Sequence, residues 1–207
     1  MLEVGCGPGR LAAALAERAL ARVWAIDASA EMIEEARSNV PASVGLKVAE
    51  AEALPFRDGW FDRAVMRMAV HLVDRSRAFT ELVRVLRPAA VFVSASHDPE
   101  TFSSGYLAPY FPSIVDIDTE RFPTATQLEE ELVGAGFESA RVERLTQDVE
   151  VARSSVLERV RSRFISTFDL IPLEEYQEGL SRIEKELPDP ARYQHHWLVA
   201  VAVRRKS

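Results

Sequence analysis

The stretch Met1-Leu-Glu-Val-Gly-Cys-Gly-Pro-Gly-Arg10 decides the fold of this 207-residue chain. A short apolar strand leads into a glycine-rich turn, and the turn opens a helix rich in alanine and leucine over residues 11–20. Glycines permit a sharp turn and the close approach of a ligand, because they have no Cβ. Asp27 ends a second apolar run, 20 residues after Gly7. In doubly wound α/β sheets this turn holds a nucleotide-like ligand, and a carboxylate at this distance accepts hydrogen bonds from its ribose.

The rest of the chain alternates between apolar runs and amphipathic stretches, a pattern typical of a parallel sheet covered by helices. The expected strands are 1–4, 22–26, 44–48, 61–66, 90–96, 137–145 and 197–203. A second helix is expected to start with Ser29 as its N-cap. Apolar stripes predict three later helices, over Phe79 to Leu86, Leu157 to Phe168 and Tyr176 to Leu187. A capping box of Thr126 and Glu129 predicts the start of another helix, which Gly136 would end.

Two segments do not fit the alternation of strand and helix. Residues 98–123 carry five prolines and glycines between aromatic residues, which indicates an irregular but packed insertion. Residues 151–192 carry the last two amphipathic stripes. We expect one domain over residues 1–207, with these two segments as cap or substrate insertions.

The spacing of the glycines separates two kinds of ligand. The dinucleotide fingerprint is G-x-G-x-x-G, whereas Gly5, Gly7 and Gly9 form G-x-G-x-G and Arg10 holds the last place of the dinucleotide pattern. This loop, with Glu3 ahead of it, resembles motif I of the class I S-adenosylmethionine (SAM) methyltransferases. Three later segments also resemble that family in order and spacing: Glu50 to Phe56, Phe61-Asp62, and Phe79 to Pro88.

The resemblance covers residues 1–97 and is strongest to the small-molecule group that includes ubiquinone- and menaquinone-type methyltransferases. It implies a Rossmann-like methyltransferase fold, with a doubly wound, mostly parallel seven-stranded sheet, the last strand antiparallel beside the fifth, and helical cap insertions. It also implies SAM as the cofactor, S-adenosylhomocysteine as its product, no metal, and methyl transfer to a small organic acceptor by in-line displacement.

The resemblance also implies roles for particular residues. Glu3 would attract the ammonium of SAM, Asp27 would accept from the ribose, Met32 would cover the adenine, and Glu50 with the Ala51 amide would contact the adenine edge. His71, after the fourth strand, would hold or deprotonate the acceptor. The full cofactor set is Glu3, Gly5, Cys6, Gly7, Gly9, Asp27, Ala28, Met32, Glu50, Ala51, Glu52, Arg67 and Met68.

Each of these residues also has a purely structural interpretation. The glycines can form a plain tight turn, Glu3 can be a charge at a strand edge, and Asp27 can mark a helix entry. Glu50 and Glu52 can be surface acids, and His71 can be a packing histidine. Cys6 fits as a small residue of the turn, and His195 and His196 point to opposite faces of a strand, so they cannot easily share a metal ion.

Composition excludes several classes. A net charge of −7 opposes a broad nucleic-acid footprint, and no apolar run approaches the roughly 20 residues of a membrane span. A single cysteine rules out an internal disulfide, and with no signal peptide ahead of the first strand we expect a cytoplasmic protein. A homodimer is left open.

Two other functions stay under consideration. The chain begins within its first strand, where the resembled family carries helices that cover the cofactor, so either the sequence starts late or this lid is lost. A lost lid, together with Ala89-Ala90 in place of two family glycines, favours a non-catalytic SAM-binding or partner-binding protein. A nucleotide-dependent oxidoreductase is disfavoured by the glycine spacing.

Overall fold

A computed structural model describes residues 1–18 and 22–206 of the chain. The strands are β1 (Leu2–Val4), β2 (Trp24–Asp27), β3 (Gly45–Val48), β4 (Phe61–Arg67), β5 (Leu86–His97), β6 (Phe137–Val151) and β7 (Ala191–Arg204). The α-helices are α1 (Arg10–Arg18), α2 (Ala30–Asn39), α3 (Arg75–Val85), α4 (Pro112–Arg121), α5 (Ala125–Gly134), α6 (Arg153–Arg161) and α7 (Leu173–Glu186). Two 3₁₀ helices are η1 (Pro99–Ser104) and η2 (Ser166–Asp169).

The strands form one seven-stranded sheet in the order β3-β2-β1-β4-β5-β7-β6. Strands β1 to β5 pair in parallel, and the last strands are antiparallel. The expected fold class is therefore confirmed, with β7 beside β5 as predicted. The strand order reverses between β1 and β4, and in open α/β sheets ligands bind at the carboxyl ends of the strands at such a point.

The described residues group into two compact units. The first comprises Met1–Ser96, Ala125–Glu143 and Leu198–Ser207, and the second comprises His97–Thr124 and Arg144–Trp197. None of the helices within residues 1–18 and 22–206 has the length and apolar character that crossing a membrane requires.

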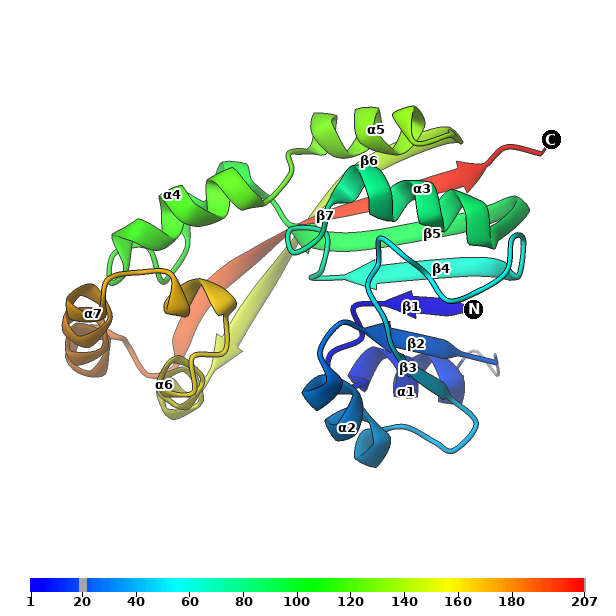
Figure 1. Ribbon diagram of the computed structural model, residues 1–207. Coiled ribbons are helices and arrows are strands. Elements are labelled where there is room, and N and C mark those ends of the chain that lie inside the picture. Colours follow the sequence, from blue (N-terminus) through cyan, green and yellow to red (C-terminus); the bar gives the residue numbers. More distant parts are fainter. Residues whose placement is uncertain (19–21, 207) are drawn as a thin grey trace. The chain divides into compact units, whose positions relative to one another are not determined.

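The core of the first unit lies on both faces of its sheet (Figure 1). Neighbouring residues along β2 belong to different core clusters: Ala25 shares one with Ile33 of α2, and Ile26 shares another with Phe79 of α3 and Leu128 of α5. This alternation explains why the strands read as nearly continuous apolar runs, since both faces of a parallel sheet are covered.

The second unit has an aromatic core of its own. Phe111, Phe168 and Tyr176 pack ring against ring, with centroids 5.0 to 6.1 Å apart. The Tyr176 hydroxyl donates to the Val160 carbonyl oxygen at 2.9 Å, so this buried polar group is satisfied. These rings share their core with buried aliphatic residues of α4, α6 and α7.

One helix boundary in the first half of the chain is untested and another differs from expectation. The helix expected over residues 11–20 is α1, described to Arg18, and residues 19 and 20 lie outside the described residues. Leu86 was expected to end a helix, but its N–H caps α3 through the Leu82 carbonyl and Leu86 is already the first residue of β5, opposite Phe61. The strand therefore begins before the expected residue 90.

The helix expected from Leu157 to Phe168 is wrong, because it breaks after Arg161. Arg163 adopts a left-handed backbone, with φ of 50°, which ends a helix. Phe164 and Phe168 still pack against each other, with ring centroids 6.0 Å apart, but through η2. Apolar spacing alone did not reveal this break, since the stripe continues through it.

The expected capping box at Thr126 is also wrong. Helix α5 begins at Ala125, so Thr126 lies inside its first turn. The Glu129 carboxylate accepts from the Val142 amide of β6 at 2.8 Å instead of from a helix-cap amide. Glu129 therefore links a helix to a strand.

The segments expected as insertions are more regular than predicted. Residues 98–123 contain η1 and α4, and the flanking strands are longer, because β6 continues to Val151 and β7 begins at Ala191. Phe111 is fully buried, as expected for this segment.

The tight packing of Gly179 in α7 yields a stability prediction. A Cβ there would collide with the Phe111 ring and the Tyr110 carbonyl oxygen, so Gly179→Ala should lower the free energy of unfolding by about 1–3 kcal/mol. Gly134→Ala in α5 is the matched control: a Cβ there meets no atom within 4 Å, and the change should be neutral or stabilising by up to about 1 kcal/mol. Chemical denaturation followed by circular dichroism measures both, and equal effects would contradict the packing argument.

Candidate functional site

The glycine loop between β1 and α1 needs its glycines for different reasons. Gly5, Gly7 and Gly9 all have positive φ angles, of 71°, 51° and 83°. A Cβ on Gly5 would lie 2.5 Å from the Ala69 Cβ, and one on Gly9 would lie 2.6 Å from the Val40 side chain. At Gly7 no atom lies within 4 Å of such a Cβ. Gly5 and Gly9 therefore allow close packing, and Gly7 leaves space that a ligand can approach.

The amides of this loop are already engaged within the protein. The Gly5 and Cys6 amides both donate to the Ile26 carbonyl at 2.9 Å. The Gly7 amide donates to Asp27 Oδ2 at 2.8 Å, and the Gly9 amide donates to the Cys6 carbonyl at 3.0 Å. Pro8 has no N–H. These four amides point to protein acceptors, so they are not the donors with which helix-opening loops hold phosphate.

Asp27 lies at the carboxyl end of β2, and its carboxylate accepts hydrogen bonds from the glycine loop and from the start of α2. Oδ2 accepts from Gly7, and Oδ1 accepts from the Ser29 amide at 2.9 Å. An ionised carboxylate has about four acceptor sites, so two stay available to a ligand hydroxyl pair. Ser29 in turn caps α2, as predicted, because its Oγ accepts from the Met32 amide at 3.2 Å. Ala28 is exposed between these residues.

Glu3 on β1 is the most unusual ionisable group near the loop. It is 2% exposed, and its Oε2 has no hydrogen-bond partner among the described residues. Burial raises the pKa of this carboxyl to about 8, while Arg67 and a backbone hydrogen bond with Ala12 act in the opposite direction. The nearby Asp27 charge raises the pKa further. A buried carboxyl with an open acceptor atom suits a cationic group that would favour its ionised form.

Cys6 and Met68 flank the same region. Burial raises the pKa of the Cys6 thiol to about 12, and its Sγ lies 3.5 Å from the Gly7 carbonyl, so Cys6 is a neutral packing residue. Met68 follows β4 with φ of 54°, a conformation that few non-glycine residues adopt and that gathers at functional sites. Its amide donates to the Ala95 carbonyl at 2.8 Å, which fixes this turn.

The remaining predicted cofactor residues lie on three segments. Met32 is half-buried in α2, and Arg67 is exposed at the end of β4. In the segment after β3, Glu50 is exposed and Ala51 is buried. Glu52 is engaged structurally, because its Oε1 accepts from the Asp74 amide at 2.7 Å.

The histidines separate into two groups. His71 is half-buried in the turn between β4 and α3, beside the exposed Leu72. His195 stacks on His97, with ring centroids 5.0 Å apart, whereas His196 Nδ1 lies 3.2 Å from Thr146 Oγ1. The two neighbouring histidines thus have different partners, as predicted for adjacent strand residues.

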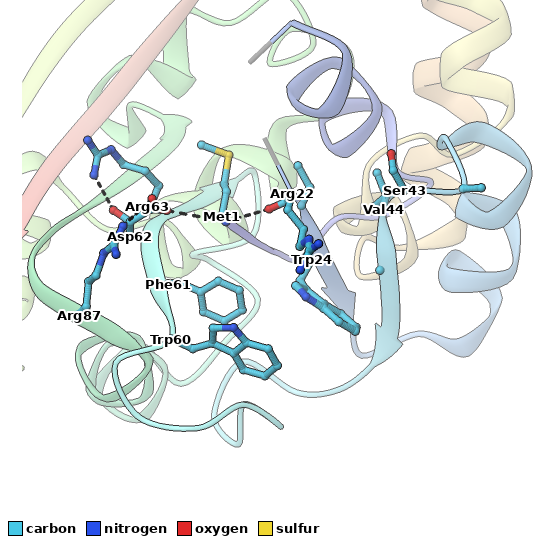
Figure 2. Close-up of a pocket in the computed structure, with 13 residues that line it drawn as sticks. Met1, Arg22, Trp24, Ser43, Val44, Trp60, Phe61, Asp62, Arg63 and Arg87 are labelled. Carbon is cyan, nitrogen blue, oxygen red and sulfur yellow. Dashed lines mark hydrogen bonds and ion pairs between the residues drawn. The ribbon is translucent and has the colours of Figure 1, made fainter. Parts of the chain in front are cut away.

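A large hollow lies at the other edge of the sheet (Figure 2). It has a volume of about 760 Å³ and is lined by the amino ends of the strands, including Met1, Trp24 and Phe61. Ligands of open α/β sheets bind at the carboxyl ends. Volume alone therefore does not identify the candidate site, which is the region around the glycine loop.

Sequence reasoning missed Glu81 and Arg84 of α3. Their side chains form an ion pair, with Arg84 Nε 2.7 Å from Glu81 Oε1, and both contact the segment after β3. The signal was present as an acid and a base three residues apart on a helix, but such pairs are common on exposed helix faces.

Comparisons with known proteins agree with this geometry. Residues 2–94 match the model of a methyltransferase domain. A malonyl-[acyl-carrier protein] O-methyltransferase of Geobacter sulfurreducens is 34% identical over 152 residues, 69% of this chain and 57% of that protein. An O-methyltransferase of Penicillium expansum is 33% identical over 157 residues, 72% of this chain and 55% of its own length.

A solved structure shares the fold at lower identity. A putative methyltransferase from an antibiotic biosynthesis pathway of Anabaena variabilis superposes with a TM-score of 0.73 at 19% identity, over 96% of this chain and 89% of that one. The chain spans just over half the length of the two curated relatives above. The glycine loop, Asp27 and Met68 all lie within the residues that match the domain model, and by this match and its relatives the chain belongs to the class I SAM-dependent methyltransferase family.

Proposed function

We propose that this protein binds SAM at the glycine loop and transfers its methyl group to a small organic acceptor. One observation carries the proposal: the amides of Gly5, Cys6, Gly7 and Gly9 are all bonded within the protein, while the buried Glu3 carboxyl beside them has an open acceptor atom. A dinucleotide would need the amides, whereas an amino-acid ammonium needs an acceptor. The residues therefore fit SAM better than a nicotinamide cofactor.

Each segment of the site would hold a different part of the ligand. Asp27 would accept from the ribose hydroxyls with its two remaining acceptor sites, and Glu3 would attract the ammonium. Glu50, the Ala51 amide and Met32 would face the adenine. SAM supplies an activated methyl group when it is bound, so the protein has to align the acceptor, exclude water and in some cases remove a proton. We propose His71 for the proton.

The acceptor is proposed from the relatives. Both curated relatives reported above are named O-methyltransferases, which favours an oxygen nucleophile.

A non-catalytic SAM-binding protein is the alternative. It shares every cofactor contact with an enzyme, so cofactor affinity cannot separate the two. Incubation with radiolabelled SAM and a panel of phenols and carboxylic acids can, because only an enzyme transfers the label at a rate that depends on its concentration.

Asp27→Ala should weaken S-adenosylhomocysteine binding by about 1–3 kcal/mol, because the ribose acceptor and the bond to the Gly7 amide are both lost. Isothermal titration calorimetry measures the dissociation constant. Asp62→Ala is the control, since Asp62 pairs with Arg87 at 2.8 Å on the opposite edge of the sheet and should leave binding unchanged. Wild-type protein that binds no S-adenosylhomocysteine at millimolar concentration would refute the proposal itself.

Ligand binding should release a proton from Glu3 at pH 6–7. The carboxyl, with its pKa raised to about 8, is mainly protonated there, and a nearby ammonium would favour the ionised form. Calorimetric titrations of S-adenosylhomocysteine in buffers of different ionisation enthalpy should show a release of up to one proton. Glu3→Gln should abolish the release, and an unchanged release in that variant would exclude Glu3 as its source.

The same residue should make stability depend on pH. Between pH 4.5 and about 8 the folded protein keeps a proton on Glu3 that the unfolded chain loses, so the free energy of unfolding falls as pH rises. The fall is at most about 1.4 kcal/mol per pH unit for one proton. Denaturation of ligand-free protein at pH 5 and pH 8 should show a smaller difference for Glu3→Gln than for the wild type.

A further inference from the structure

The segment between β3 and β4 contains no helix or strand, yet it carries the residues proposed to meet the adenine. Its apolar side chains Ala51, Leu54 and Phe56 are buried in the core of the first unit. Buried side chains fix one side of the segment, and its backbone groups still need partners. Three of those partners come from side chains of α3.

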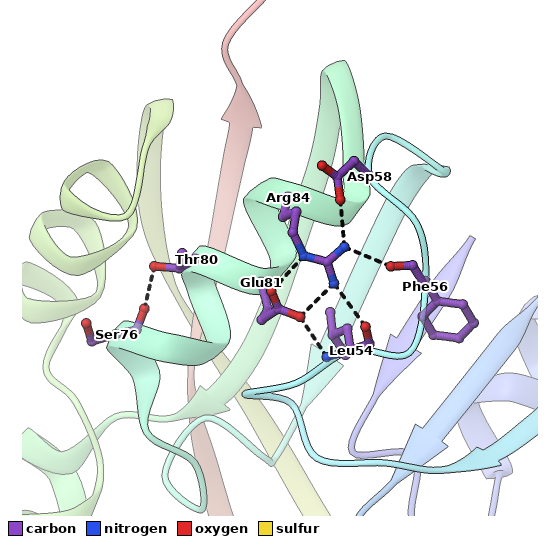
Figure 3. Close-up of polar contacts among 7 residues, drawn as sticks. All are labelled: Leu54, Phe56, Asp58, Ser76, Thr80, Glu81 and Arg84. Carbon is purple, nitrogen blue, oxygen red and sulfur yellow. Dashed lines mark hydrogen bonds and ion pairs between the residues drawn. The ribbon is translucent and has the colours of Figure 1, made fainter.

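One guanidinium group supplies two of the three (Figure 3). The Arg84 nitrogens donate to the carbonyl oxygens of Leu54 at 2.9 Å and Phe56 at 2.8 Å. The same group donates to Asp58 Oδ1 at 2.7 Å. Arg84 thus binds the backbone at two places and a side chain at a third, all within five residues of the segment.

Glu81 completes the arrangement from one turn earlier in α3. Its two oxygens accept from Arg84 Nε and Nη2 at 2.7 Å, and Oε2 also accepts from the Leu54 amide at 2.7 Å. The hydrogen bond from Arg84 holds the pKa of the Glu81 carboxyl below its usual value, so the pair stays charged at neutral pH. The amide and the carbonyl of Leu54 are therefore both fixed by one bidentate ion pair.

The start of the segment lies at the protein surface. Glu50 is exposed, and the turn that follows it is closed by the Ala53 amide, which donates to the Glu50 carbonyl at 3.3 Å. Leu54 is therefore one of the fixed points that set the position of Glu50 and of the Ala51 amide, beside the Ala49 amide, which donates to the Asp27 carbonyl at 2.9 Å, and Glu52, which accepts from the Asp74 amide.

We propose that Arg84, oriented by Glu81, is a positioning residue that fixes the adenine-recognising backbone of residues 50–56. This inference rests on the proposed function, because it concerns the SAM site. Arg84 touches no ligand in this proposal and acts only through Leu54 and Phe56.

A second ion pair on the same helix provides a matched control. Arg75 makes a bidentate pair with Glu131 of α5, at 2.5 and 2.9 Å, and its side chain is 24% exposed against 32% for Arg84. No hydrogen bond between Arg75 and the segment after β3 is found in the described part of the chain. Replacement of Arg75 should therefore change the stability of the protein without changing the recognition of the adenine.

The test compares two probes that differ at the adenine edge. S-adenosylhomocysteine carries the N6 amine, and S-inosylhomocysteine carries an oxygen there, so their dissociation constants report recognition of that edge. Arg84→Met should weaken the binding of the adenosyl compound by about 5- to 50-fold and that of the inosyl compound much less. The ratio of the two dissociation constants should therefore fall towards one. Arg75→Met should leave the ratio at the wild-type value. Glu81→Gln keeps one acceptor oxygen and should give an intermediate ratio.

The outcomes separate the two proposals. Equal ratios in the Arg84→Met, Arg75→Met and wild-type proteins would overturn the positioning role, even if both variants are less stable. Wild-type protein that binds neither probe would instead refute the proposed function. If Arg84→Met does not fold, the ratio is read from Arg84→Lys and Glu81→Gln, and an unchanged ratio in both overturns the inference equally.

Discussion

The site depends on the attachment of the glycine loop to the carboxyl end of β2. The Ile26 carbonyl accepts two loop amides, and the Asp27 carboxylate accepts a third. These bonds determine the shape of the loop and also its chemistry, because amides bound to the protein cannot hold a phosphate group. The loop therefore presents Cα atoms and the open space at Gly7, next to the buried Glu3 carboxyl. The loop contacts and the Glu3 carboxyl together support the proposed cationic ligand.

The first unit contains two carboxylates in opposite electrostatic environments. Glu3 is buried without a cation in hydrogen-bonding contact, so its pKa rises and its charge is available only when a ligand compensates for burial. Glu81 is paired with Arg84, so its charge persists and serves to hold a backbone segment. The first arrangement suits binding of a charged group, and the second suits the positioning of a recognition element.

Much of this organisation could be predicted from local sequence. The glycine loop, the run ending at Asp27, the Ser29 cap and the fold class all follow from short-range patterns, and the structure confirms their geometry. Helix ends were less predictable: the stripe from Leu157 to Phe168 continued across the break at Arg163, and Glu129 matched a capping box but binds Val142 of β6. In each case a contact that is remote in sequence, or a single backbone angle, overrode the local pattern.

The sequence by itself determined the alternation of strands and helices and the glycine loop, because apolar periodicity and the glycine spacing are local properties of the chain. Only the tertiary structure decided which polar groups stay free. Whether a loop amide can hold a phosphate depends on where Ile26 and Asp27 lie, and the fixed position of Leu54 depends on a guanidinium group 30 residues further along. Hydrogen-bond satisfaction is a property of atoms brought together by folding, and no pattern of neighbouring residues records it.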